Sequence, residues 1–271
     1  MLKYFVLSTI LFSGLAFAQK SEIEKNKVNG KPTSIEESMQ KASIRMQQIT
    51  GYELQYHTKS IYNKDGNPVS REYFNEDGNR VSSENFTYNE ENKIISSEMK
   101  SEDETLKFYF QYEYTEDGYT IVKSENDVNI LQTEYKLDNN QNVIYEKETN
   151  LFEEGNLFTE KKYEYTGGFL TKTIVKYNNG SHTLLYKNDA LGNAVEEQYM
   201  DKNNKLIYKF VRKFDKNQNI TEEITYDTNS KITNSSQIMY EYDEQKNWIK
   251  RTQYTSKIDE PISNTLRTIR Y

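Results

Sequence analysis

Apolar and polar residues alternate along most of this chain. In one run the positions of one parity are all aromatic, namely Phe108, Phe110, Tyr112 and Tyr114. The positions between them are mostly polar, namely Tyr109, Gln111 and Glu113. Successive side chains of a β-strand point to opposite faces, so a period of two is typical of a half-buried strand. The pattern predicts antiparallel strands with one core-like face and one solvated face.

Short polar turns separate the alternating runs. One clear copy of the turn phrase reads Tyr73-Phe-Asn-Glu-Asp-Gly-Asn79, and others begin at Ile61, Tyr186, Lys213 and Glu241. Gly and Asn tolerate the positive φ that tight turns require. Asp-Gly between two alternating runs is a strong hairpin signal. The phrase therefore predicts a hairpin turn wherever it recurs.

The aromatic residues before these turns recur at intervals of roughly 13 residues, which suits one strand plus one turn. The interval from Tyr88 to Tyr114 is about twice as long and predicts two units joined by a degenerate turn. A unit this short cannot bury its apolar face alone, so neighbouring units must stack. The sequence predicts an all-β fold, an antiparallel β-hairpin repeat array that forms a curved continuous sheet and can include one short N-terminal helix.

The segment from Ser34 to Ile49 fits two structures. Ser34 and Glu37 can form a helical capping box, and apolar residues from Ile35 onwards recur at helical spacing. The same residues, with Ile35 and Met39 on one parity, also fit an alternating strand. Local sequence leaves helix and strand both open here.

The N-terminus reads as a secretory signal peptide. A basic Lys3 is followed by an apolar run that ends in Ala16-Phe17-Ala18, a small-x-small cleavage signature. The run is too short to be a membrane-spanning helix. We expect cleavage after Ala18 and a secreted, periplasmic or cell-surface location. The organisation predicted is a signal peptide at 1–18, an N-terminal segment of helix or strand at 19–58, and a β-repeat domain at 59–271.

Composition removes several classes of function. The chain has no Cys, which excludes disulfides, thiol catalysis and Cys-bound metal. Its 23 Tyr and 12 Phe residues supply most of the large apolar area. A formal net charge of −7 argues against binding to nucleic acid, which needs a concentrated basic surface. No cofactor is predicted.

The chain also lacks recognisable catalytic or metal-binding spacing. His57 and His182 are far apart in sequence, and neither belongs to a metal-binding motif. The stretch from Asp138 to Asn142 mimics the start of a calcium loop but lacks the later Gly and Glu, so it reads as a hairpin turn. Sequence neighbours such as Glu222-Glu223 point to opposite faces of a strand and cannot form a glycosidase pair. We predict no metal site, no catalytic residue and no enzyme activity.

With its turns laid out, the chain resembles the YD-repeat (RHS-type) family, in particular its short secreted members from Bacteroidota. The resemblance covers roughly Lys59 to Tyr271 and rests on the phrase Tyr-Asp-x-x-Gly-Asn, seen here as Tyr242-Asp-Glu-Gln-Lys-Asn247. It implies β-hairpins that wind into a curved sheet. Large members close into a shell around a toxin, and some members are described as carbohydrate-binding. This chain is too short for such a shell, so we do not expect it to enclose a cargo.

These observations favour an exported, non-catalytic binding or scaffold protein of the cell envelope or exterior. Its ligand would be a glycan or an envelope protein held against one face of the sheet. The candidate ligand-binding residues are Trp248, Tyr242, Tyr226 and Tyr208, because exposed aromatic faces stack on sugars and protein surfaces. Trp248 alternatively caps the core of the last repeat.

Three other interpretations are open. Export, alternation and the terminal Tyr271 also fit an outer-membrane β-barrel, although Arg267 and Arg270 lie on opposite faces of the last run and one of them would face lipid. A glycan hydrolase would need two carboxylates converging in a cleft. Finally, an open array leaves unpaired strand edges, which predicts edge-to-edge self-association.

Overall fold

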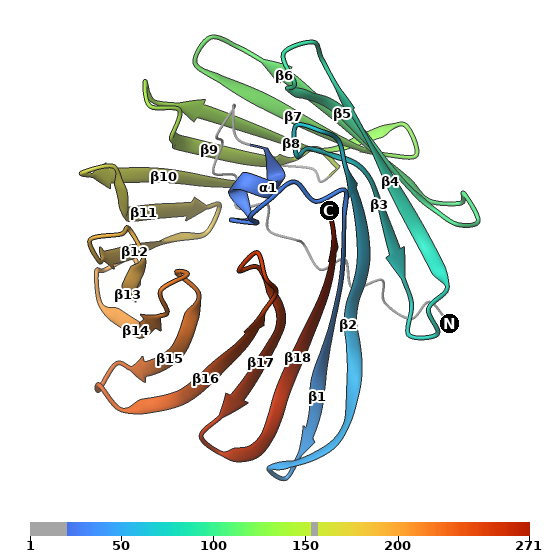
Figure 1. Ribbon diagram of the computed structural model, residues 1–271. Helices are drawn as coiled ribbons and strands as arrows, with labels where there is room; N and C mark the ends of the chain where they lie inside the picture. Colours follow the sequence, from blue (N-terminus) through green and yellow to red (C-terminus); the bar gives the residue numbers. More distant parts are fainter. Residues whose placement is uncertain (1–20, 153–156) are drawn as a thin grey trace.

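The computed structural model describes residues 21–152 and 157–271 (Figure 1). The predicted signal peptide at 1–18 lies outside the described residues. A single short helix, α1 (Glu22–Lys25), precedes an 18-stranded antiparallel sheet. Within the described ranges, no helix has the length and apolar character needed to cross a bilayer.

The strands are β1 (Ser34–Arg45), β2 (Gln48–Tyr62), β3 (Pro68–Phe74), β4 (Arg80–Tyr88), β5 (Ile94–Ser101), β6 (Lys107–Tyr114), β7 (Gly118–Glu125), β8 (Val128–Leu137), β9 (Val143–Asn150), β10 (Phe158–Thr166), β11 (Phe169–Tyr177), β12 (Gly180–Asn188), β13 (Ala194–Met200), β14 (Leu206–Phe214), β15 (Ile220–Asp227), β16 (Ile232–Tyr242), β17 (Trp248–Thr255) and β18 (Ile258–Arg270).

The sheet is a closed barrel. Each strand pairs with the next along the chain, and β18 pairs with β1 from Ser34 opposite Arg270 to Lys41 opposite Ser263. Figure 1 shows the resulting ring. The all-β antiparallel prediction is confirmed, but the expected open curved sheet is wrong. Strand twist and the bulges beside most turns curl the sheet until its two ends meet.

Closure also removes the basis for edge-to-edge self-association. An open array would present two unpaired edges, and these would be β1 and β18. Both strands instead have partners on each side, because they hydrogen-bond to each other as well as to β2 and β17. Along the paired lengths of β1 and β18 in the described part of the chain, no backbone edge is left open for a second copy.

The turn phrase forms one recurrent geometry. In the turn between β12 and β13, Asp189 Oδ1 accepts hydrogen bonds from the backbone N–H groups of Leu191 and Asn193, both at 2.9 Å. Gly192, the fourth turn residue, has φ +85°. The same acceptor role falls to Asn63, Asn75, Asn89, Asp138, Asp201, Asp215, Asp227 and Asp243. The Asx residue and the left-handed fourth position explain the phrase.

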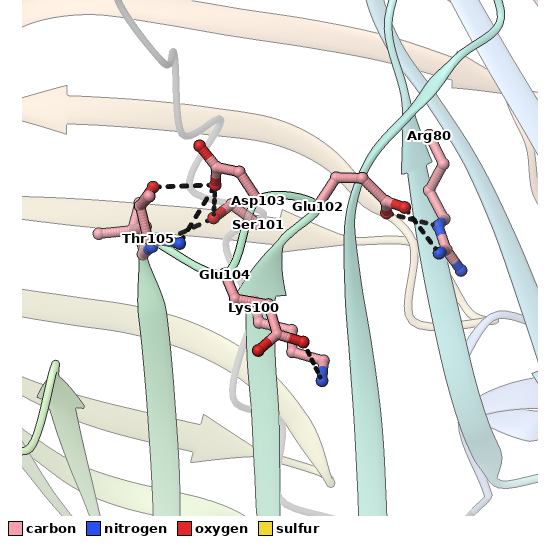
Figure 2. Close-up of polar contacts among 8 residues, drawn as sticks. Arg80, Lys100, Ser101, Glu102, Asp103, Glu104 and Thr105 are labelled. Atoms are coloured by element: carbon pink, nitrogen blue, oxygen red, sulfur yellow. Dashed lines mark hydrogen bonds and ion pairs between the residues drawn. The ribbon is translucent and has the colours of Figure 1, made fainter.

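The degenerate turn predicted in the long aromatic interval joins β5 to β6 and is shown in Figure 2. Here Asp103 Oδ1 accepts hydrogen bonds from the hydroxyls of Ser101 (2.6 Å) and Thr105 (2.8 Å). The turn is also tied to β4, because Arg80 donates to both carboxylate oxygens of Glu102 at 2.9 and 3.1 Å. A different sequence thus performs the same reversal.

The segment left open between helix and strand is strand. β1 and the start of β2 occupy it, with a turn at residues 46–47. The capping box that does form is Ser21 with Glu24, at α1. Pairing of β1 with two neighbours outweighs the local helical pattern around Ser34, because the ladder satisfies every backbone group. The predicted boundary at 58/59 falls inside β2.

One face of every strand points into the barrel. Ile35 on β1 and Tyr62 on β2 pack with Ile23 and Val28 in a buried cluster, and Ile269 on β18 borders it. Figure 1 shows α1 within the ring, so this face is the lumen side. Following the strand register around the barrel assigns each residue to the lumen or to the outer wall.

Residues 21–33, here called the N-terminal strap, cross the barrel mouth beside the seam between β18 and β1. On one side of the seam, Ile23 N–H donates to the carbonyl of Gly66 in the β2–β3 turn at 3.3 Å. On the other side, Asn29 N–H donates to Asn247 Oδ1 in the β16–β17 turn at 2.7 Å. The strap therefore links the turns that flank the closure.

Candidate functional site

The lumen side differs between two parts of the barrel. Every strand from β2 to β9, here called the packed wall, contains at least one buried residue. No residue of β12 to β15, here called the open wall, is buried, although the structure describes all of these strands. The inward side chains of the open wall, whose strands are labelled in Figure 1, are therefore only partly buried.

The packed wall holds an ionic network. Arg71, 7% exposed, contacts Glu22 of the strap at 2.8 Å and donates to Ser60 Oγ at 2.9 Å. Glu84 accepts hydrogen bonds from the hydroxyls of Ser97 (2.9 Å) and Tyr73 (3.1 Å). Burial raises the pKa of Glu84. These groups bind one another, so we assign them a structural role in joining the strap to the wall.

The open wall carries a continuous aromatic stack. His182 on β12 stacks on Tyr199 of β13 with ring centroids 4.5 Å apart, and Tyr199 stacks on Tyr208 of β14 at 4.7 Å. Tyr177 extends the stack at one end (5.9 Å) and Phe210 at the other (5.1 Å). These five residues are called the aromatic ladder. The strand register creates it, because Tyr199 pairs directly with Tyr208.

An ion-paired group lies at one end of the ladder. Arg212 on β14 donates to Glu223 at 2.7 Å and to Glu197 at 2.9 Å. Its guanidinium also lies 5.2 Å from the ring centre of Phe210. Flat apolar rings beside fixed donors and acceptors are the groups that bind a ring-shaped ligand rich in hydroxyls.

His182 behaves as an aromatic platform. Desolvation lowers its pKa, so the ring is neutral at pH 7. Its Nδ1 is buried and has no hydrogen-bond partner within the described part of the chain. The imidazole therefore contributes a flat face to the ladder.

The four predicted site residues do not form one cluster. Tyr208 belongs to the aromatic ladder. Tyr226 lies on the outer wall, where Lys209 Nζ sits 5.0 Å from its ring centre. The hydroxyl of Tyr242 joins the β14–β15 turn by donating to Asp215.

Trp248 is also placed in a packed setting. The guanidinium of Arg267 lies 3.5 Å from the centre of its ring, and Tyr240 meets it edge-on at 6.3 Å. Arg267 is in turn held by Glu37 of β1 at 2.6 Å. One face of the indole is therefore already covered, which matches the structural alternative considered for this residue.

Sequence reasoning missed His182 and Tyr199. Both lie on inward positions of alternating runs, which was visible, but so do most aromatic residues of the chain. The missing signal was the register that sets Tyr199 opposite Tyr208. A count of residues back from the turn between β13 and β14 would have paired Tyr199 with Ile207, because a bulge between Tyr199 and Met200 shifts the register by one residue.

No group of three or more His, Asp or Glu side chains in the described ranges could hold a metal ion. Asp138 instead organises the β8–β9 hairpin turn, as predicted, by accepting the N–H groups of Asn140 and Asn142. A cavity of about 160 Å³ under the strap is lined by residues such as Ile23, Val28 and Gly66. That volume is below the usual range of ligand pockets.

Ion pairs join neighbouring strands on the outer wall. Lys250 pairs with Glu241 at 2.7 Å, and Lys172 pairs with Glu164 at 2.9 Å. Each pair joins neighbouring strands on the face opposite the lumen. Ion pairs at these positions are typical of a surface that faces water.

No family model matches the chain, and no curated protein sequence matches it. Among solved structures, a porin-like protein from Bacteroides uniformis has 9% identity and a TM-score of 0.50, over 88% of this chain and 97% of that one. A porin-like protein from Bacteroides vulgatus has 10% identity and a TM-score of 0.36, over 88% of this chain and 97% of that one. The TcdB2-TccC3-Cdc42 structure has 11% identity and a TM-score of 0.35, over 84% of this chain and 15% of that one.

The comparisons concern the fold. The Bacteroides uniformis structure shares the closed antiparallel β-barrel, while the lower TM-scores of the other two add nothing to it. The resemblance to the YD-repeat family stays a prediction, since no family model matches.

Proposed function

We propose that this protein is an exported, non-catalytic binding protein of the cell envelope that holds a saccharide against the aromatic ladder inside its barrel. The observation that carries the proposal is the contrast between the two walls. Three stacked rings, those of His182, Tyr199 and Tyr208, lie on β12, β13 and β14, and none of these strands contains a buried residue. The sequence predicted a ligand on one face of the sheet, and in this proposal that face is the one that lines the lumen.

The chemistry of the ladder suits a sugar. The C–H face of a pyranose packs on Tyr199 and Tyr208, and its hydroxyls reach the donors of Arg212 or the acceptors of Glu197 and Glu223. Because these polar groups are already fixed by one another, they lose little freedom when a ligand binds.

The same ionic group argues against hydrolysis. Glu197 and Glu223 converge on Arg212, but the guanidinium bonds to both carboxylates. A glycosidase needs one carboxylic acid that keeps its proton near neutral pH. Both carboxylates are held by the same guanidinium, so they do not face each other across a cleft as a separate acid and base.

A glycan array probed with the mature protein tests the proposal. We expect binding to at least one class of saccharide, weakened at least tenfold by the double variant Tyr199→Ala/Tyr208→Ala, because two stacking faces of about 1 kcal/mol each are removed. Tyr226→Ala is the matched control, since that ring faces outward on the neighbouring strand, and it should bind like wild type. An empty array together with an empty pull-down from envelope material would remove the proposal.

A second candidate is an outer-membrane β-barrel. The likeness to a porin-like protein from Bacteroides uniformis favours it. A β-sheet can span a membrane only as a closed barrel, and the sheet of this protein is closed. The ion pairs on the outer wall, such as Lys172 with Glu164, oppose it, since the lipid-facing band of a membrane barrel is apolar. Fractionation decides. A membrane barrel stays with the membrane until detergent is added, whereas a water-facing barrel is released with the soluble envelope contents.

A further inference from the structure

One inward arginine lacks a carboxylate partner. Three others on the lumen side each contact a carboxylate: Arg71 at 2.8 Å, Arg212 at 2.7 Å and Arg267 at 2.6 Å. Arg251 on β17 forms no salt bridge within the described residues. Its hydrogen bond to the amide oxygen of Gln253 is long, 3.5 Å from Nη2, and its guanidinium also interacts with the hydroxyl of Tyr240, which is uncharged.

The register places Arg251 on the lumen side. It pairs with Tyr240 on β16 and with Thr265 on β18, and Thr265 is 2% exposed on the inside of the barrel. Arg251 itself is half-buried. A partly desolvated cation without a counter-charge is unfavourable, and an arriving anion relieves that cost.

One other arginine lies near Arg251 on the lumen side. Arg267 is the nearest other cation along the lumen side of the adjoining strand, and its charge is compensated by Glu37. This leaves the charge of Arg251 uncompensated by the described side chains. The whole chain has a formal net charge of −7, so an anion is attracted only at short range.

We infer that Arg251 binds the carboxylate of an acidic saccharide inside the barrel. The inference rests on the proposed function, because it names the class of sugar that the lumen takes. A guanidinium offers parallel N–H donors that match the two oxygens of a carboxylate. The ring of Tyr240, beside it, offers an apolar face to the sugar that carries the carboxylate.

The protein carries its own probe. Trp248 is the single Trp of the chain, and it meets Tyr240, the cross-strand partner of Arg251, edge-on. Intrinsic fluorescence is titrated with oligogalacturonate, with its neutral methyl ester, and with inorganic sulfate. We expect a saturable change with oligogalacturonate, at least tenfold weaker binding of the ester, and no saturable change with sulfate.

Variants locate the charge. Arg251→Gln should weaken oligogalacturonate binding at least tenfold without changing binding of the ester, whereas Arg251→Lys should keep part of the affinity. Arg270→Gln is the matched control, because it removes the same charge from an exposed position on the outer face, and its affinity should equal that of wild type. Circular dichroism of each variant separates lost binding from lost folding, and Arg251→Lys serves if Arg251→Gln does not fold.

The inference fails if Arg251→Gln binds oligogalacturonate as wild type does, or if the ester binds equally well. In either case saccharide binding, and with it the proposed function, still stands. A response to sulfate that competes with oligogalacturonate and persists in the Tyr199→Ala/Tyr208→Ala variant would make the site a small-anion site and overturn the saccharide assignment. If neither saccharide binds and the glycan array is empty, the inference and the proposed function fall together.

Discussion

The packed wall and the open wall are built from the same repeat and the same turn, yet their interiors differ. On the packed wall, small inward residues such as Ser82 and Ser97, each 2% exposed, alternate with bulky ones such as Arg71 and Phe108. Small residues next to large ones let side chains interdigitate to native density. On the open wall large rings stand opposite one another and stack, as Tyr199 does on Tyr208. The repeat forms the strands of both walls. The sizes of the inward side chains on neighbouring strands determine how tightly the lumen side of each wall is packed.

The comparison is tested most strongly by the same truncation on each wall. Phe108→Ala on the packed wall should lower the free energy of unfolding by about 3 to 4 kcal/mol, because the residue is 7% exposed and leaves a cavity. Phe210→Ala on the open wall should cost about 1 kcal/mol, because its ring is only partly buried. Chemical denaturation measures both. Equal losses would mean that the two walls are packed alike.

Arginine removal gives a second pair of measurements. Arg71→Ala should cost about 3 kcal/mol, because it leaves the carboxylates of Glu22 and Glu84 buried without a counter-charge. Arg212→Ala should cost about 1 kcal/mol, since water can reach Glu197 and Glu223 on the open wall. A larger loss for Arg212→Ala than for Arg71→Ala in denaturation experiments would reverse the assignment of the two walls.

The turns should not distinguish the walls. Asn89→Ala, beside the packed wall, and Asp189→Ala, beside the open wall, each remove a side chain that accepts two backbone N–H groups. Each should cost about 1 kcal/mol, the value of a comparable capping bond, and the two melting curves should shift alike. Asp189→Asn keeps the Oδ1 acceptor but places an amide N–H against the side chain of Asn193, which donates to Asp189 Oδ2 at 2.9 Å, so it should recover only part of the loss. Unequal shifts would show that the turns depend on how the wall behind them is filled.

The smallest expected effect is the pH dependence that His182 contributes on the open wall. Burial lowers the folded-state pKa of His182 below its unfolded value near 6.5, so the unfolded chain binds more protons between the two values. The stability that this residue contributes is fully present above pH 6.5 and is lost as the pH falls towards the folded pKa. His182→Phe keeps the stacking and removes the titration. Between pH 7.5 and 5.5 its melting temperature should fall less than that of wild type, and parallel curves would contradict the assignment.

Local sequence determined the elements of this protein. Period-two alternation gave the strands, and Asx residues with a left-handed fourth position gave the turns, because both depend on residues adjacent in the chain. The inward aromatic face that begins at Phe108 was readable for the same reason. Local sequence failed where two local patterns conflicted. Ser21 and Ser34 both begin a capping box, and only the first starts a helix.

Tertiary structure alone decided closure and the site. Whether β1 meets β18 depends on twist and bulges summed over every strand, and no short window contains that sum. The aromatic ladder depends on register, because a slip of one residue would turn Tyr199 to the outer wall and leave Tyr208 without its partner. The same holds for Arg251. The closed barrel places a carboxylate beside each of the inward residues Arg71, Arg212 and Arg267, and none within salt-bridge distance of Arg251 among the described residues. The sequence by itself determined the strands and turns of the barrel wall. Pairing between strands determined the closure of the barrel and the arrangement of side chains in its lumen.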